Sequence, residues 1–389
     1  MSNHSLHHPM SVSTLTRHRA FWNHEEMDRP SWGVTLGFFA NEAYPRLMAK
    51  MPSGPVQPEN ILIPELLQDF DARWEAQQGI GDFPFTCSPF PAIPWLEAMA
   101  GCPIMASPTS FWAEPCLADY HTWQWPSRVL ENPWAQKLLE VMRALAEHAR
   151  GRYQVSPTLM RGPADILAAM RGASQFALDF LDTPEHIRPA LEQCAALWRE
   201  MAQAQLDLIP PSSEGYVALE SSLRAWAPER LLWLQEDAMA LLSPKLYREF
   251  ILPLDTELSG LFPCIAFHLH GTALWAVDSL VHVPSADLDG DPFGGELFQD
   301  SFKPSGEVLC IDPPDDQRFV FLNFLPAGER PLHITICRFQ IQLNRIDSGD
   351  MDQAINRPKG RAVEVEGNTR KLRRKFRIER KNKLPIEIG

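Results

Sequence analysis

The chain has 389 residues, of which 45% are apolar and 22% charged, a balance that allows a sizeable buried core. Its formal net charge of −13 disfavours nucleic acid as a partner, because binding a polyanion requires a cationic surface. The N-terminal sequence lacks the apolar run of a signal peptide, and no stretch approaches the roughly 18 uninterrupted apolar residues of a membrane span. We therefore expect a soluble, cytoplasmic protein without a membrane partner. Homo-oligomerisation stays open.

The seven cysteines are scattered along the sequence and include no Cys-x-x-Cys pair, which indicates free thiols rather than a disulfide framework. The charge is uneven as well. Residues 357–389 hold 12 basic and 4 acidic side chains, a charge of +8, which leaves −21 on the rest. Such a basic C-terminal segment is typical of a solvated extension, with a specific anion-binding arm as the alternative.

The first third of the chain shows little regular periodicity. Residues 1–12 are expected to be disordered, and a first helix is predicted over residues 13–26, before the turn-like Asp-Arg-Pro at 28–30. Residues 31–130 are rich in Pro, Trp and Phe, which predicts short strands and long loops around a cleft.

From residue 134 onward strands and helices alternate. Helical spacing of apolar residues and Pro-based start signals predict helices, and short apolar runs predict strands. The predicted helices cover residues 134–148, 164–171, 183–201, 243–254 and 273–281, and the predicted strands cover residues 153–160, 217–223, 231–235 and 264–268. This alternation favours a parallel sheet with right-handed crossovers, either a closed barrel or an open doubly wound sheet. No glycine-rich phosphate loop follows a strand, which lowers the nucleotide-binding alternative.

The sequence Phe-His-Leu-His-Gly at residues 267–271 is the strongest candidate for chemistry, because it lies between an apolar strand and a helix. In a β/α barrel the carboxyl ends of the strands form the active-site face. On an extended segment His268 and His270 point the same way, with Cα atoms about 6.5–7 Å apart. The two imidazoles suit a metal or a proton-transfer role. The alternative is that one histidine caps the next helix and the other is a core residue.

Three further charged residues lie at predicted strand ends. Asp237 follows the strand at 231–235 and could orient an imidazole, or could simply cap a helix. Glu220 lies within an apolar run, where a charge is costly unless it is paired. Arg161 ends the strand at 153–160 and could hold a substrate carboxylate or form a surface salt bridge.

Four tryptophans could line an aromatic pocket for the substrate, although tryptophan is more commonly a core residue. They are Trp32, Trp112, Trp226 and Trp233.

Several short motifs occur in an order that resembles the uroporphyrinogen decarboxylase-like superfamily, over about residues 14–284. They are Gly-Pro-Ala-Asp-Ile-Leu at 162–167, Arg-Gly at 171–172, Asp-Thr-Pro-Glu at 182–185, Asp237, Leu-Ser-Pro-Lys-Leu-Tyr-Arg-Glu-Phe at 242–250, Pro253 and His-Leu-His-Gly at 268–271. Upstream runs at 89–103 and 110–115 resemble an uncharacterised branch of it. The resemblance implies an α/β fold, the eight-stranded (β/α)8 TIM barrel, over residues 13–345, with 286–345 atypical and 346–389 a basic tail.

The superfamily has two known chemistries. The true decarboxylases act on a tetrapyrrole without a cofactor and use an N-terminal Arg-Gln-Ala-Gly-Arg motif, whereas this chain has Ser-Trp-Gly-Val-Thr-Leu-Gly-Phe-Phe at 31–39. The other members transfer methyl groups between corrinoid proteins and thiols, with zinc on a His-x-Cys pair and a later Cys. Here His268 matches that His, His270 replaces the first Cys, and Cys337 lies 67 residues beyond His270. Zinc accepts imidazole as well as thiolate.

The resemblance therefore implies an enzyme with a small-molecule substrate and two alternatives for its chemistry. The first is methyl transfer to a thiol or a corrinoid, with zinc on His268 and His270, Asp237 or Glu220 in proton transfer, and a corrinoid protein as partner. The second is a decarboxylase without a cofactor, in which His268 donates a proton and Arg161 holds a carboxylate. A non-catalytic corrinoid- or tetrapyrrole-binding protein is the third reading.

The pattern changes near residue 285. Residues 285–315 are dense in Gly, Pro and Asp, and residues 337–342 alternate apolar and polar side chains, unlike barrel strands buried on both faces. A shifted reading frame or a replaced terminus would produce this change. We therefore expect residues 286–389 to be loosely packed and Cys337 not to be a metal ligand.

Overall fold

The computed structural model describes residues 10–23, 25, 39–77, 81–218 and 225–280, and the backbone of residues 309–312 and 320–322. For residues 269–272, 274, 277 and 278 the backbone alone is described. The chain divides into two compact units, Met1–Gln340 and Ile341–Gly389, and every described element belongs to the first. Within the described residues no helix is long and apolar enough to cross a membrane.

The N-terminal third contains more helix than the sequence predicted. Its elements are α1 (Val12–Trp22), α2 (Ala40–Ala43), α3 (Pro45–Met48), β1 (Gly54–Val56), the 3₁₀ turn η1 (Pro58–Asn60), α4 (Ile63–Gln77), β2 (Thr86–Cys87), α5 (Trp95–Ala100), β3 (Ile104–Ala106) and β4 (Phe111–Ala113). The prediction of short strands and loops over 31–130 is wrong for α4, a helix of 15 residues. Its buried stripe includes Asp69 and Arg73, and these charged residues masked the helical period.

The central third follows the predicted pattern closely. It contains η2 (Val129–Glu131), α6 (Pro133–Ala149), β5 (Gln154–Val155), β6 (Met160–Arg161), α7 (Pro163–Arg171), α8 (Ala173–Asp182) and α9 (Pro184–Leu206). Proline at the first turn of α6, α7 and α9 costs no helical hydrogen bond, so each begins where the start signal predicts. The strand predicted over 153–160 is divided into β5 and β6, because Pro157 between them has no N–H for the ladder.

The last described part completes the alternation of strands and helices. Its elements are β7 (Tyr216–Ala218), β8 (Ala225–Ala227), β9 (Leu231–Gln235), η3 (Asp237–Leu241), α10 (Pro244–Leu246), the π-helical turn η4 (Tyr247–Ile251), α11 (Leu252–Leu261), β10 (Cys264–His270), η5 (Gly271–Ala276), α12 (Val277–Leu280), β11 (Leu309–Asp312) and β12 (Val320–Leu322).

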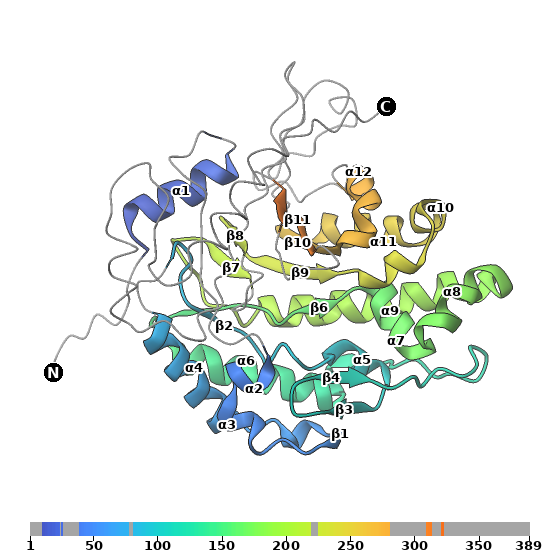
Figure 1. Cartoon of the computed structure of the whole chain (residues 1–389), viewed down its shortest axis with the longest axis horizontal. Coiled ribbons are helices and arrows are strands. Elements are labelled where there is room, and N and C mark those ends of the chain that lie inside the picture. The colour runs from blue at the N-terminus through green and yellow to red at the C-terminus, as the bar shows by residue number, and fades with distance from the viewer. Residues whose placement is uncertain are drawn as a thin grey trace, which may run out of the picture. The chain divides into compact units, whose positions relative to one another are not determined.

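A largely parallel sheet organises these elements (Figure 1). Its strand order is β12-β11-β10-β9-β6, and only the β11–β12 pair is antiparallel. β5, at the start of the β5–β6 segment, pairs in parallel with β2. A parallel α/β arrangement is thus confirmed. The described strands do not close into a barrel, so the eight-stranded TIM barrel over residues 13–345 stays a prediction.

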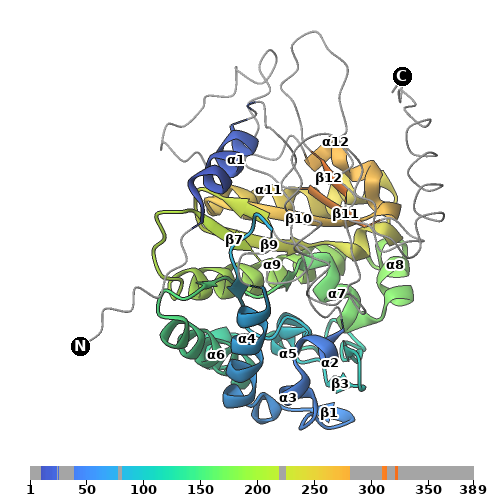
Figure 2. The same ribbon diagram turned by 60° about the vertical axis from the view of Figure 1, so that its left-hand side comes forward.

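One predicted strand lies elsewhere. We expected residues 217–223 to join the parallel sheet, but β7 pairs antiparallel with β8 in a separate two-stranded sheet. That expectation is wrong for residues 217 and 218, while 219–223 lie outside the described residues. The hairpin is anchored to α1, because the ring of Trp226 stacks on His18 with centroids 5.3 Å apart. Figure 2 shows α1 near this hairpin and α4, α5 and α6 on the other side of α9.

The central strands are buried on both faces, as expected of parallel strands covered by helices. Leu232 and Leu234 of β9 belong to the main core, whereas Leu231 and Trp233 pack on the opposite face with Ala266. His268 follows Ala266 by two residues, so it lies on the same face as Trp233, at ring centroids 5.9 Å apart.

Candidate functional site

The parallel strands β6, β9 and β10 bring two predicted residues, Arg161 and His268, level with Gln235. Gln235 at the end of β9 is the register partner of Arg161 in β6 and of His268 in β10. Because parallel strands present their carboxyl ends at one edge, these residues and Asp237 lie at the same edge of the sheet. We call this region, defined by Arg161, Gln235, Asp237 and His268, the carboxyl edge.

His268 and Asp237 form the central contact of this edge. Nε2 of His268 lies 3.6 Å from Oδ1 of Asp237. The side chain of His268 is 6% exposed and that of Asp237 is 30% exposed, so the pair has one buried and one open member. The Gln235 side-chain amide donates to Oδ2 of Asp237 and so orients the carboxylate. The imidazole and the carboxylate therefore face each other at the carboxyl edge.

Arg161 lies beside this pair and is held by Glu97 of α5. Nη1 of Arg161 donates to Oε1 of Glu97 over 2.8 Å, and the side chains are 34% and 1% exposed. The negative charge of Glu97 raises the pKa of Arg161, with smaller contributions from Asp165 and Asp237. The guanidinium is therefore held by a buried carboxylate and is still partly exposed to solvent.

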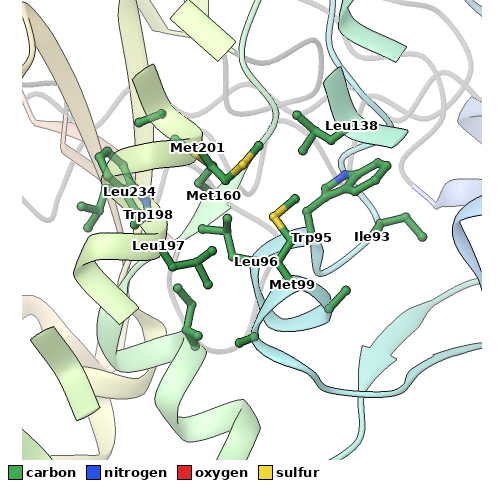
Figure 3. Close-up of a cluster of buried hydrophobic side chains, with 14 of the residues drawn as sticks. Ile93, Trp95, Leu96, Met99, Leu138, Met160, Leu197, Trp198, Met201 and Leu234 are labelled. Carbon is green, nitrogen blue, oxygen red and sulfur yellow. The ribbon is translucent and has the colours of Figure 1, made fainter. Parts of the chain in front are cut away.

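The hydrophobic core fixes the position of Glu97. Every residue of α5 is buried, and Figure 3 shows its Leu96 and Met99 beside Leu197 and Met160. A glutamate inside such a segment is costly unless it is paired, and Arg161 supplies the partner.

Helix α7 begins directly after Arg161 and is tied to the end of β9 by two reciprocal hydrogen bonds. The amide of Ala164 donates to Oε2 of Glu236 over 3.1 Å, and the amide of Ala238 donates to Oδ1 of Asp165 over 2.6 Å. Gly162 makes this approach possible, because a Cβ at this position would overlap the Glu236 carboxyl group. The close packing of Glu236 against Gly162 thus explains the glycine of the Gly-Pro motif at residues 162–163.

Three buried carboxyl groups next to this edge have raised pKa values. Burial, reinforced by the charge of Asp237, raises the pKa of Asp165 well above its ordinary value. Burial and the neighbouring Asp255 and Asp165 do the same for Glu236. Burial raises the pKa of Asp255 to about 7, although hydrogen bonds from Tyr247 and Glu236 oppose the shift. Carboxyl groups that ionise less readily than usual therefore lie behind the exposed residues of the edge.

Apart from Trp233, whose ring lies beside His268, the other predicted site residues lie elsewhere or outside the described residues. Trp112 on β4 is 40% exposed and donates through its indole N–H to Glu114, while Trp226 is 4% exposed and donates to the Glu214 carbonyl oxygen. Trp233 is 1% exposed and belongs to the core. The remaining predicted positions, Trp32, Glu220, the side chain of His270, and Cys337, lie outside the described residues.

A metal site is not assembled by the residues that the structure describes. Among them, no group of three or more His, Cys, Asp or Glu side chains is arranged to hold a metal ion. The backbone of β10 does extend to His270, so His268 and His270 share one extended strand as predicted.

Sequence reasoning overlooked Glu97, Glu236 and Asp255, which the structure places around the carboxyl edge. Asp165 was interpreted as a charge that suits the helix dipole, but it is 7% exposed and receives a hydrogen bond from Ala238. The available signal was the surrounding sequence. Glu97 interrupts an apolar segment, where an acidic residue implies a partner.

Comparison with known proteins identifies no family. No protein-family model matches the sequence, and no curated protein matches it. Among solved structures, the chain is similar to a methyltransferase from Methanosarcina mazei, at 15% identity, with 71% of this chain and 75% of that chain covered and a TM-score of 0.47. A similarity at this level does not identify a substrate or a reaction. Membership of the uroporphyrinogen decarboxylase-like superfamily stays a prediction.

Proposed function

We propose that this chain is an enzyme that binds a carboxylate-bearing small molecule at Arg161 and transfers a proton through His268. The observation that carries the proposal is the 3.6 Å contact of His268 with Asp237, level with Arg161 at the ends of three parallel strands. An imidazole oriented by a carboxylate is a typical arrangement for general acid–base catalysis near neutral pH.

Decarboxylation is the reaction class that uses these groups most directly. Arg161 would hold a carboxylate of the substrate through the part of its guanidinium that faces solvent, because Glu97 already accepts from Nη1. Loss of carbon dioxide breaks a carbon–carbon bond and leaves the electron pair on the substrate carbon. His268, protonated and paired with Asp237, would then donate its proton to that carbon. Burial of the imidazole limits competition from water.

Methyl transfer to a thiol or a corrinoid is the second candidate, favoured by the position of His268 and His270 on one strand. The described residues alone do not form a zinc ligand set, so we derive no step through a metal. Metal analysis of the purified protein separates the two candidates, since one equivalent of zinc that is lost in His270→Ala would favour transfer. Corrinoid or tetrapyrrole binding without turnover would instead favour the non-catalytic binding protein.

Three variants test the decarboxylase proposal. Purified protein is incubated in D₂O with a panel of mono- and dicarboxylic acids, and carbon dioxide release and deuterium incorporation are measured. We expect His268→Ala to lower the rate by about 10²-fold or more. Arg161→Gln combined with Glu97→Gln should raise KM strongly, because the anion-binding cation is lost while no buried charge is left unpaired.

Glu97→Gln alone is the matched control, because it retains the guanidinium and removes only its anchor. We expect this variant to keep substrate binding. If His268→Ala retains full activity, or if the double variant binds and turns over substrate as well as the wild type, the proposal is wrong.

A further inference from the structure

A pair of thiols lies in contact outside the carboxyl edge. Sγ of Cys102 is 3.4 Å from Sγ of Cys116, and both thiols are reduced. Cys102 is 4% exposed, whereas Cys116 is half-buried and follows the exposed residues Glu114 and Pro115. Cys116 is therefore the more accessible residue of the pair, and the sulfur of Cys102 lies in contact with its sulfur.

The backbone holds this pair in place. Cys102 and Cys116 flank the β3–β4 hairpin, in which Ile104 pairs with Ala113 and the amide of Glu114 donates to the carbonyl oxygen of Pro103 over 2.8 Å. The backbone pairing thus extends to Pro103, next to Cys102, and to Glu114, two residues before Cys116. A disulfide bond is about 2.05 Å long, so an approach of roughly 1.4 Å between the sulfurs would form it.

We propose that Cys102 and Cys116 are a redox-sensitive modification site, at which a peroxide converts the two thiols into an intramolecular disulfide. The accessible Cys116 is the attacking thiol and the buried Cys102 is the resolving thiol. This assignment is independent of the proposed function.

The chemistry is balanced with hydrogen peroxide as the oxidant. The Cys116 thiolate attacks one peroxide oxygen, which breaks the O–O bond, forms a sulfenic acid and releases hydroxide; this hydroxide takes up the proton lost by Cys116 and becomes water. The Cys102 thiol then attacks the sulfenic sulfur and releases a second water. Two thiols lose two electrons in total, and one peroxide is reduced to two waters. A small dithiol reverses the step by thiol–disulfide exchange.

The electrostatics of the pair agree with these roles. A hydrogen bond from Cys102 lowers the pKa of Cys116, although burial opposes the shift. The same hydrogen bond, together with burial, raises the pKa of Cys102. A thiol is most reactive when it is ionised and accessible, which favours Cys116 as the site of first attack.

The modification would reach the carboxyl edge through the backbone. The amide of Cys102 donates to the carbonyl oxygen of Glu97 over 2.9 Å, and the amide of Cys116 donates to the carbonyl oxygen of Met170 over 2.9 Å. The disulfide would therefore connect the end of α5, whose Glu97 anchors Arg161, with the end of α7. Oxidation is expected to act on the segment that positions Glu97.

The test maps the oxidised sulfurs in the full chain. The protein is treated with hydrogen peroxide, the remaining thiols are alkylated under denaturing conditions, and chymotryptic peptides are analysed by mass spectrometry. Cleavage after Phe111 or Trp112 places Cys102 and Cys116 in separate peptides. We expect these two peptides to be disulfide-linked, the count of seven thiols to fall by two, and dithiothreitol to restore it.

Cys194 is the competing partner, because it is a further buried thiol near the pair. Cys194→Ser and Cys87→Ser should leave the linked peptides unchanged, whereas Cys102→Ser should leave a sulfenic acid on Cys116 that dimedone traps. A disulfide from Cys116 to any other cysteine would overturn the proposal. So would peroxide treatment that oxidises Cys116 to a sulfinic acid while Cys102 stays a thiol.

Discussion

The two ends of helix α7 each carry an arginine and a buried carboxylate, but they use them differently. At its end, Arg171 donates through Nε and Nη2 to the two oxygens of Asp179 and through Nη1 to the carbonyl oxygens of Leu117 and Ala118. Its guanidinium also lies 4.8 Å from the centroid of the Tyr120 ring. Each guanidinium nitrogen thus has a protein acceptor, which makes Arg171 a structural residue.

At the start of α7, Arg161 bonds Glu97 through Nη1 and is 34% exposed, against 10% for Arg171. Its neighbours Asp165 and Glu236 are carboxyl groups whose pKa is raised by burial, while Asp179 at the other end has a lowered pKa. The comparison shows that an arginine–carboxylate pair does not by itself mark a site. Two properties distinguish Arg161, the candidate binding arginine, from the structural Arg171. Arg161 is more exposed, and the pKa values of its neighbouring carboxyl groups are raised rather than lowered.

Arg171→Gln should give the largest effect on stability, a loss of about 3–5 kcal/mol in the free energy of unfolding, because it leaves the buried Asp179 without its cation. Urea unfolding measures this loss. The matched variant at the other end, Arg161→Gln with Glu97→Gln, removes both charges together and should change stability by only about 1 kcal/mol. Equal losses in the two variants would contradict the distinction between the two ends.

Gly162→Ala and Gly172→Ala should each cost about 1–3 kcal/mol, for different reasons. The new methyl group at 162 displaces the Glu236 carboxyl group from the amide of Ala164. A Cβ at Gly172 would make only an ordinary contact with Pro115, at 3.5 Å, but the φ of +82° is one that an alanine adopts only with strain. Only Gly162→Ala should also alter the pH dependence of stability, measured as the melting temperature between about pH 4 and pH 8. If Gly172→Ala altered it equally, Glu236 would not be its source.

The sequence was sufficient to predict the elements that are regular and apolar. The continuous run at 231–235 is β9 with the predicted bounds, and the stripe of Ile187, Leu191 and Trp198 lies on the buried face of α9. Patterns fail where charge is buried. Arg73 lies 5.1 Å from the centroid of the Tyr44 ring inside the fold, so α4 has no clean apolar face. The pairing of β7 with β8 depends on contacts with α1, which local sequence does not encode.

The same limit applies to the candidate site. Arg161, Asp237 and His268 could be selected because they lie at the ends of apolar strands. Parallel pairing then brings Arg161 and His268 level with Gln235, two residues before Asp237. Glu236 and Asp255 could not be selected, because a buried carboxyl group that keeps its proton is indistinguishable in sequence from an exposed charge. Only their shared burial, with both side chains fully inaccessible to solvent, identifies them.

The smallest effects should be changes in how the free energy of unfolding depends on pH. The carboxyl groups near the two ends of α7 should change this dependence in opposite directions. Burial raises the pKa of Asp255, which hydrogen-bonds Glu236, to about 7, above the value of about 3.9 in an unfolded chain. The native state then binds more protons between these values, so this group's contribution is fully present below about pH 4 and is lost as pH rises toward 7. Asp255→Asn stays neutral and should flatten this decline.

Asp179 should show the opposite behaviour. Burial opposes its ionisation, but hydrogen bonds from Arg171, Gln175 and Tyr120 outweigh burial and lower its pKa. Its contribution is therefore present above the unfolded value of about 3.9 and is lost as pH falls through the lower folded pKa. Asp179→Asn should reduce stability at neutral pH and lose that difference in acid. Urea titrations of both variants between about pH 3 and pH 8 measure the two slopes. The prediction is wrong if both variants deviate from the wild type over the same pH range. In that case the pKa values of Asp255 and Asp179 would not be shifted in opposite directions.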